Sequence, residues 1–210
     1  MENVKLNVDN ITIAGTYYDS NSSDGVILLH MLPNTKEAYK DFAKELQKDY
    51  KVIAIDFRGF GESDLDWKTF DENDWNKLVD DVHAAREYLE KKGVNKINII
   101  GASIGANTAL NYAAENKDVN AIVLLSPGLN YRGIKTDKTI KQFDGDILII
   151  VNDGDTGSYE DSKRLSELNK EVVLKVYKGN KHGTNMLNDE AKNLIKGFIK
   201  WNLHLWKKEF

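Results

Sequence analysis

The chain has 210 residues with 29 basic and 33 acidic side chains, a formal net charge of −4, and no cysteine. This length is sufficient for one domain with a sizeable core. A chain without a basic excess has nothing with which to neutralise phosphates, which argues against nucleic-acid binding. The lack of cysteine excludes disulfides, thiolate nucleophiles and thiolate metal sites, and it fits a reducing compartment.

The N-terminal stretch MENVKLNVDN lacks the basic segment and apolar run that form a secretory signal. No stretch approaches the ~18 apolar residues that a membrane-spanning helix requires. We therefore expect a cytoplasmic protein that binds neither membranes nor nucleic acid.

Short β-rich runs alternate with longer helical patterns along the chain. Residues 6–8 and 11–17 alternate apolar and polar side chains around Asp9-Asn10, which is typical of a β-hairpin. The next run, GVILLHML at residues 25–32, is continuously apolar, as expected of a parallel strand buried on both faces. Further runs of that type occupy residues 51–56, 96–101, 120–126, 146–151 and 172–177.

Three stretches carry an apolar stripe at helical spacing, namely residues 36–49, 75–93 and about 190–206. Gly93 is expected to cap the second of these helices at its C-terminus. The stripes consist of Ala38, Phe42, Ala43 and Leu46 in the first helix, Leu78, Val82, Ala85 and Leu89 in the second, and Leu194, Ile195, Phe198, Ile199 and Trp201 in the third.

This alternation predicts an α/β fold with a mostly parallel sheet, helices on both faces and an antiparallel hairpin at one edge. The sequence has no internal repeat, linker or low-complexity segment. We therefore expect a single domain over residues 1–210.

The apolar run INII leads directly into Gly101-Ala102-Ser103-Ile104-Gly105, a G-x-S-x-G motif at the boundary between a strand and a helix. Two interpretations compete: the glycines admit a nucleotide phosphate, or they let the serine stand out as a nucleophile. In the second interpretation the serine backbone is strained, and its hydroxyl projects at a helix N-terminus that favours developing negative charge. The position between a buried strand and an amphipathic helix favours Ser103 as a nucleophile.

A nucleophilic serine needs a base, and the base needs an orienting acid. Of the histidines, His83 lies inside a helical pattern, His204 lies near the C-terminus, and His30 ends a strand ahead of the nucleophile. His182 follows the last strand in a glycine-flanked loop, where an imidazole can reach a neighbouring strand end. His182 is therefore the expected base.

The orienting acid and the oxyanion donors each have two candidates in the sequence. Asp153 and Asp155 both follow the strand at residues 146–151, and the one that does not orient the base is expected to form a turn. The amide of Ile104 begins a helix and supplies one oxyanion donor. The second donor lies in the loop after the strand at residues 25–32, where Met31 and Leu32 have amides and Pro33 has none.

The motifs together resemble the α/β-hydrolase superfamily, and in particular its small serine esterases without a cap domain, of the dienelactone-hydrolase-like or feruloyl-esterase-like kind. The resemblance covers nearly the whole chain. It is carried by the elbow GASIG, the acid turn VNDGD, the histidine loop GNKHGT and the segment DFRGFGES at residues 56–63. We interpret residues 56–63 as a turn whose polar side chains satisfy loop backbone, and not as a metal or phosphate site.

The resemblance implies a triad of Ser103, Asp155 and His182, in the chain order that α/β-hydrolases use. It places the oxyanion donors at the amides of Leu32 and Ile104, and it requires no cofactor and no metal. Met31 departs from the family pattern, which usually has glycine there, and its side chain is expected to narrow the pocket wall.

About twenty residues separate Ser126 from Ile147, too few for the multi-helix cap that many relatives insert at this point. We therefore expect a shallow, partly open site that cleaves small-molecule esters of short acyl chains. Four side chains are candidates for lining the site, although a buried structural role suits each of them equally well: Trp67, Tyr131, Tyr159 and Met186.

Other functions remain as alternatives. Tyr159 and Lys163 match the Tyr-x-x-x-Lys pair of short-chain dehydrogenases, but a glycine turn in mid-chain is wrongly placed for such an enzyme. A ligand-binding or signalling module with slow turnover, a thioesterase and a lactonase are also compatible with the motifs.

The aromatic end WNLHLWKKEF is expected to pack on its own sheet, and the protein is expected to be a monomer or a homodimer.

Overall fold

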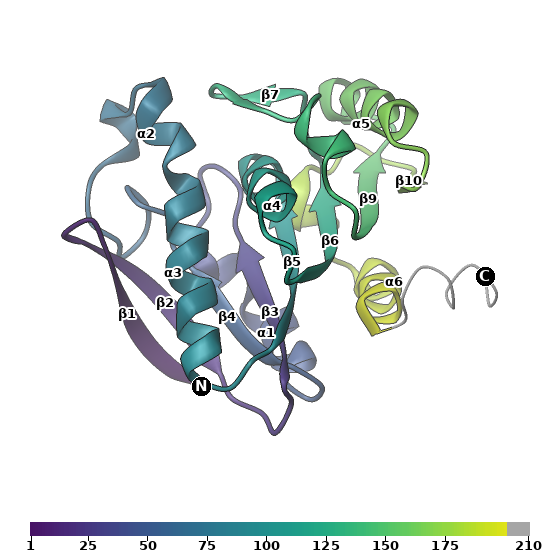
Figure 1. Cartoon of the computed structure of the whole chain (residues 1–210). Helices are drawn as coiled ribbons and strands as arrows, with labels where there is room; N and C mark the ends of the chain where they lie inside the picture. The colour runs from purple at the N-terminus through teal and green to yellow at the C-terminus, as the bar shows by residue number, and fades with distance from the viewer. Residues whose placement is uncertain (201–210) are drawn as a thin grey trace.

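The structure is a computed structural model that describes residues 1–200, so Trp201, His204 and the end of the last predicted helix lie outside the described residues. An eight-stranded sheet runs through it in the order β1-β2-β4-β3-β5-β6-β9-β10 (Figure 1). Its strands are β1 (Glu2–Val8), β2 (Ile11–Tyr18), β3 (Asp24–Leu29), β4 (Lys51–Ile55), β5 (Lys96–Ala102), β6 (Val119–Leu125), β9 (Asp146–Asn152) and β10 (Val173–Tyr177).

The first two strands form the predicted hairpin at one edge of the sheet. β1 and β2 are antiparallel, and Asp9 and Asn10 between them have φ values of 48° and 68°. Positive φ at both central residues is what a tight hairpin turn requires, and Asp and Asn tolerate that conformation. β2 joins β4 in antiparallel register, and all the remaining neighbours in this sheet are parallel.

The parallel part of the sheet changes its winding direction at β3. This strand pairs with β4 on one side and with β5 on the other. In open α/β sheets, ligands bind beyond the carboxyl ends of the strands at such a switch point. The loops after β3 and β5 therefore lie side by side at the edge where a site is expected.

The strand predictions are confirmed, with two differences: β3 ends at Leu29 and not at Leu32, and β10 is less buried than expected. β3, β5, β6 and β9 are almost entirely buried, whereas every residue of β10 is partly exposed. β10 is the outermost strand and pairs only with β9, so solvent reaches it from its free edge.

Helices cover both faces of the sheet, as predicted. Val82 of α3, Leu110 of α4 and Leu165 of α5 belong to one hydrophobic core, while Phe42 of α1 and Phe198 of α6 belong to a second. In Figure 1, α3 and α4 cross the near face of the sheet. The helices are α1 (Lys40–Leu46), α2 (Glu72–Asn76), α3 (Leu78–Lys91), α4 (Ile104–Glu115), α5 (Thr156–Leu168) and α6 (Asp189–Lys200).

The predicted stripe of the first helix is wrong at its start. Residues Lys36–Tyr39 form a 3-10 turn before α1, and Tyr39 is buried there while Ala38 is exposed. A 3-10 turn has about three residues per turn, so its inward positions differ from those of an α-helical stripe. The stripe of α3 is buried as predicted, and Gly93 follows that helix with φ of 81°.

The segment between β6 and β9, which the structure describes in full, contains no α-helix. It forms a small hairpin of β7 (Asn130–Tyr131) and β8 (Ile134–Lys135), followed by a 3-10 turn at Thr139–Lys141. The expectation of no multi-helix cap in this segment is confirmed.

Within residues 1–200 there is also no helix with the length and apolar character that crossing a membrane requires.

Candidate active site

Ser103 lies at a sharp turn between β5 and α4, as its motif predicts. Its φ of 52° and ψ of −117° are strained for a residue with a side chain. The turn is held because Ser103 N donates to Leu125 O of β6 at 2.8 Å, while Ser103 O accepts from Ala106 N at 2.9 Å. The strain is therefore imposed by the sheet and by the first turn of α4.

The two glycines of the motif allow close approach of neighbouring backbone. A Cβ on Gly101 would lie 2.2 Å from Gly105 O, and a Cβ on Gly105 would lie 2.5 Å from Leu29 O. Backbone at that distance cannot move aside without breaking the sheet, so neither position accommodates a side chain. Of these three residues only Ser103 has a strained, positive φ. Gly101 and Gly105 are required because no side chain fits at either position.

The structure brings His182 and Asp155 together from two different loops. His182 Nδ1 lies 2.7 Å from Asp155 Oδ2, with the Asp155 side chain 16% exposed and the His182 side chain 34% exposed. Asp155 follows β9 and immediately precedes α5, and His182 follows β10. A carboxylate in this position fixes the imidazole with its proton on Nδ1 and leaves Nε2 as an acceptor.

Asp153, the other candidate for the acid, points to different partners. Its Oδ2 accepts from Lys178 Nζ at 2.7 Å, and its Oδ1 accepts from Gly179 N at 3.1 Å. The hydrogen bond from Lys178 holds the pKa of Asp153 below its usual range. Asp153 therefore ties the end of β9 to the loop after β10, which is a turn-forming role.

The loop that carries His182 is tied down on both sides of the histidine. Lys181 N donates to Asn152 Oδ1 at 3.0 Å, and Gly183 N donates to Ser126 Oγ at 3.0 Å. Ser126 directly follows β6 and has φ of 51°. Neither Asn152 nor Ser126 was predicted at the site, because a polar residue at the end of a buried strand has no motif of its own.

Contacts of Gly183 place the histidine loop against the Ser103 turn. A Cβ at 183 would lie 3.4 Å from the Cβ of Ala102, the residue before Ser103, and 2.5 Å from Met31 Sδ. Gly183 also has φ of 55°. The Met31 side chain, expected to narrow the pocket wall, is buried in the core below this loop.

The loop after β3 orients one backbone amide. Met31 O accepts from His30 Nδ1 at 3.0 Å and from Asn34 N at 2.8 Å. In a trans peptide the N–H points opposite to the C=O, so Leu32 N–H is directed away from both donors. The orientation of the Leu32 amide is thus fixed by the contacts of the Met31 carbonyl, and the amide of Ile104, the other predicted oxyanion donor, begins α4.

His30 is a buried structural histidine. Its Nε2 accepts from Phe57 N at 3.1 Å, so the neutral ring carries its proton on Nδ1 and donates it to Met31 O. Burial lowers the pKa of His30 to about 4, an effect that the hydrogen bond to Met31 partly opposes. His30 is thus neutral near pH 7 and holds the 31–32 peptide in place.

The turn at residues 56–63 has the structural role that was predicted for it. Asp56 is fully buried and accepts from the backbone of Lys36 and Glu62 and from Lys36 Nζ. Ser63 Oγ donates to Asp56 O at 2.6 Å. Arg58 forms a two-pronged ion pair with the buried Asp81.

Two hydroxyl groups lie beside the His182–Asp155 pair. Ser158 Oγ is 3.4 Å from His182 Nδ1 and 2.9 Å from Tyr131 Oη. The Tyr131 ring lies edge-on to the imidazole with ring centroids 6.5 Å apart. Tyr131, one of the predicted lining residues, therefore lies at the site, and Ser158 was missed.

The other predicted lining residues have contacts elsewhere. Trp67 stacks on Phe60 with centroids 5.6 Å apart, and Met186 is buried in the core. Lys163 Nζ lies over the Tyr159 ring and pairs with Glu160, so the Tyr-x-x-x-Lys pair lies along α5. His83, on α3, contacts the ring of Tyr112.

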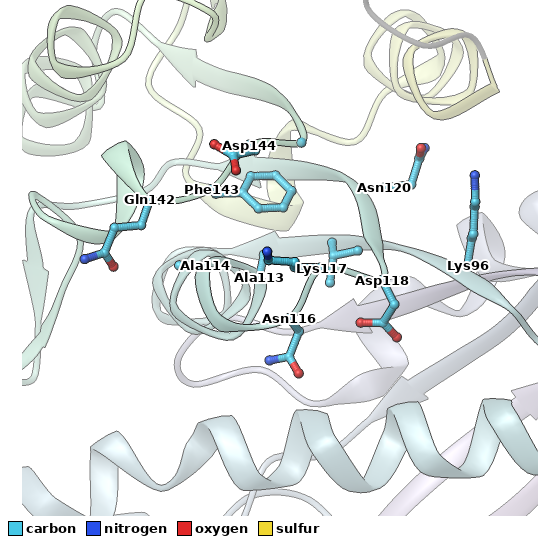
Figure 2. A pocket seen from close by; sticks show the side chains of 12 residues that line it. Lys96, Ala113, Ala114, Asn116, Lys117, Asp118, Asn120, Gln142, Phe143 and Asp144 are labelled. Carbon is cyan, nitrogen blue, oxygen red and sulfur yellow. The ribbon is translucent and has the colours of Figure 1, made fainter.

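A cavity of about 380 Å³ lies at the opposite edge of the sheet, where β5, β6 and β9 begin (Figure 2). Its labelled side chains carry both charges together with amides, and Phe143 supplies an apolar surface. Ser103, Asp155 and His182 all follow the carboxyl ends of their strands, so this cavity is separate from them.

Within residues 1–200 no cluster of three or more histidine, cysteine, aspartate or glutamate side chains is arranged to hold a metal ion.

Comparison with known proteins gives a family match over most of the chain. Residues 25–170 match the family described as the alpha/beta hydrolase fold. The AB hydrolase superfamily protein YisY of Bacillus subtilis (strain 168) is 34% identical over 104 residues, which cover 48% of this chain and 37% of that protein. The chain spans only 37% to 39% of the length of the curated relatives it matches.

Solved structures share the fold over nearly the full chain. The esterase Pf2001 of Pyrococcus furiosus is similar with a TM-score of 0.82 and 23% identity, over 96% of this chain and 92% of that one. Est1E of Butyrivibrio proteoclasticus, solved with ferulic acid bound, has a TM-score of 0.79 and 19% identity, over 93% of this chain and 97% of that one.

Proposed function

Since the chain belongs to the α/β-hydrolase fold family, we propose that it is a serine hydrolase that cleaves carboxylic esters of short acyl chains through an acyl-enzyme. Ser103 is the nucleophile, His182 the base and Asp155 the orienting acid. The observation that carries the proposal is the 2.7 Å contact between His182 Nδ1 and Asp155 Oδ2, in a loop that packs against the Ser103 turn.

The first half-reaction forms the acyl-enzyme. His182 Nε2 accepts the hydroxyl proton of Ser103 while Ser103 Oγ bonds to the ester carbonyl carbon, and the π electrons move to the carbonyl oxygen. The tetrahedral species then collapses. Its bond to the alcohol oxygen breaks, and that oxygen takes the proton from His182 Nε2.

The second half-reaction repeats these steps with water. His182 removes a proton from water as the water oxygen bonds to the acyl carbon, and the proton then returns to Ser103 Oγ as the acid leaves. Asp155 remains ionised throughout and holds the imidazole. The steps use only these side chains and water, so the proposal includes no cofactor.

The amides of Leu32 and Ile104 are the proposed donors to the oxyanion. Both are backbone groups on fixed elements, so they need no reorganisation when negative charge develops. One such donor typically stabilises the transition state by about 3 kcal/mol. The helix N-terminus at Ile104 adds a favourable dipole.

The two structural neighbours support an ester as the substrate class. Pf2001 is named an esterase, and Est1E binds ferulic acid. Each has the same fold at low identity, so the support for activity comes mainly from the geometry of Ser103, His182 and Asp155.

Short acyl chains are expected to be the better substrates. The segment between β6 and β9 carries only a small hairpin and a 3-10 turn, so it encloses little apolar surface for a long chain. We expect kcat/KM for acetyl and butyryl p-nitrophenyl esters to exceed that for the dodecanoyl ester. The reverse order of kcat/KM would refute this preference.

Covalent labelling tests the nucleophile directly. A fluorophosphonate probe is expected to modify the protein once, and peptide mass spectrometry should place the modification on Ser103. Heat-unfolded protein serves as the control, because labelling requires the assembled site. Modification at another serine, or none, would contradict the proposal.

A further inference from the structure

The hairpin that carries Tyr131 is fixed to the helix that begins at the Ser103 turn. Asn107, fully buried in α4, donates from Nδ2 to Ile134 O at 2.8 Å and accepts on Oδ1 from Gly128 N at 3.0 Å. The buried Thr136 Oγ1 donates to Gly128 O at 2.7 Å. These bonds join both ends of the hairpin to α4, so it is a rigid support for Tyr131.

Close packing on Gly128 sets the position of the tyrosine ring. A Cβ at Gly128 would lie 2.6 Å from Tyr131 Cζ, so only glycine lets the ring lie this close to the backbone. The ring is nearly perpendicular to the His182 imidazole, at 86°. The Tyr131 ring is thus held edge-on to the imidazole of His182, with its hydroxyl 2.9 Å from Ser158 Oγ.

The hydrogen bonds around this hydroxyl leave its proton available. Asp155 Oδ2 at 2.7 Å takes the Nδ1 proton of His182 in preference to Ser158 Oγ at 3.4 Å. The Ser158 hydroxyl can therefore donate to Tyr131 Oη. The Tyr131 proton can then be donated to Ser126 O at 3.3 Å, which is long for a bond between oxygens, and the same hydroxyl also interacts with Ser103.

Tyr131 remains protonated over the working pH range. Burial raises the pKa of its phenol, and hydrogen bonds with Ser158 and Ser103 only partly oppose this. A neutral phenol donates a single proton, and a strong acceptor that enters the site can take that hydrogen bond from Ser126 O.

The order of strands places Tyr131 on the side of the leaving group. The proposed oxyanion donor Leu32 follows β3, on one side of β5, whereas Tyr131 and His182 follow β6 and β10, on the other side. The alcohol oxygen must lie near His182, which protonates it. Because the Tyr131 hydroxyl also interacts with Ser103, we expect the alcohol part of the ester to lie within its reach.

We propose that Tyr131 contacts the substrate and donates a hydrogen bond to the alcohol oxygen of the ester as its bond to the acyl carbon breaks. This inference rests on the proposed function. The electron pair of the breaking bond stays on the alcohol oxygen, His182 Nε2 supplies the proton it receives, and the phenol keeps its own proton. The hydrogen bond strengthens as charge develops on that oxygen, so it matters most for strongly basic leaving groups.

The test compares two butyrate esters that share an acyl group and differ in the leaving alcohol. For Tyr131→Phe we expect kcat/KM to fall roughly ten- to hundredfold on ethyl butyrate, the range typical of a hydrogen bond to a charged group. On p-nitrophenyl butyrate, whose leaving group is weakly basic, we expect a fall of less than about threefold. Both kcat/KM values report the acylation step, so deacylation does not enter the comparison.

Tyr88→Phe, on α3, is the matched control, because it removes a hydroxyl far from the site and should leave both kcat/KM values unchanged. The phenylalanine at 131 keeps the ring that packs on Gly128, and circular dichroism checks that the variant is folded. An equal fall on both esters would show that Tyr131 only supports the position of His182, and no fall on either would also overturn the inference. A wild-type protein that hydrolyses neither ester and resists the fluorophosphonate would instead overturn the proposed function and this inference with it.

Discussion

Replacing Ser103 by alanine is expected to lower kcat for ester hydrolysis roughly a millionfold, because no other side chain in the proposed mechanism bonds to the carbonyl carbon. The variant should keep its fold. Alanine retains the Cβ, so the backbone at φ 52° and the packing around Gly101 and Gly105 do not change. The measurement is kcat on p-nitrophenyl butyrate, with thermal unfolding as the check on folding.

Ser63→Ala is the matched control for this loss. Ser63 donates to Asp56 O and accepts from Ala14 N, so its removal should cost about 1 kcal/mol of folding free energy for each bond. Its kcat should remain within a few-fold of wild type. A folded Ser103→Ala protein that retains more than about one-hundredth of wild-type kcat would mean that another group is the nucleophile.

The sequence predicts the fold well where an element is determined by residues that are close together in the chain. Continuous apolar runs such as residues 25–29 must be buried on both faces, and two turn-forming residues, Asp9 and Asn10, join the strands of the hairpin. The Ser103 turn was also predictable, because its two glycines and its position between strand and helix leave few alternatives. The α/β-hydrolase fold implied by these motifs is confirmed by the family match and by the sheet order.

What the sequence leaves open depends on contacts between distant segments. Asp153 and Asp155 are two residues apart and equally suited to the acid by local pattern. Only the position of β10 decides between them, since its following loop presents Lys178 to Asp153 and His182 to Asp155. In the same way, His30 sets the orientation of the peptide between Met31 and Leu32 from inside the core, which no local pattern indicates.

Small polar residues at strand ends hold the candidate site together. Ser126 accepts from Gly183 N with its hydroxyl and from Tyr131 Oη with its carbonyl, so one residue links the histidine loop to the β7–β8 hairpin. Asn152 holds the other side of the histidine through Lys181 N. Serine and asparagine are common in loops for many reasons, so this role becomes visible only when the partners are known.

Asp155→Asn is expected to lower kcat by roughly ten-thousandfold, whereas Asp153→Asn should stay within a few-fold of wild type. An asparagine at 155 can turn its NH₂ group toward His182 Nδ1, which then becomes an acceptor. The proton of the neutral imidazole moves to Nε2, and that nitrogen can no longer accept the proton of Ser103. The expected fall in kcat is thus caused by the wrong tautomer of His182, and the variant should remain folded.

Asp153→Asn is the matched control, because it also replaces an aspartate by asparagine, two residues before Asp155. It tests whether the fall in kcat depends on the position of the carboxylate or only on the loss of one negative charge. Asparagine at 153 still accepts from Gly179 N, and it loses only an ion pair with Lys178, whose side chain is 96% exposed. Exposed ion pairs contribute little to stability, so folding and kcat should both be nearly unchanged. The measurement is kcat on p-nitrophenyl butyrate for both variants at pH 7. Equal losses, or a larger loss at 153, would show that the carboxylate that holds the base is not the one at 2.7 Å from His182, and the proposed triad would then be wrong.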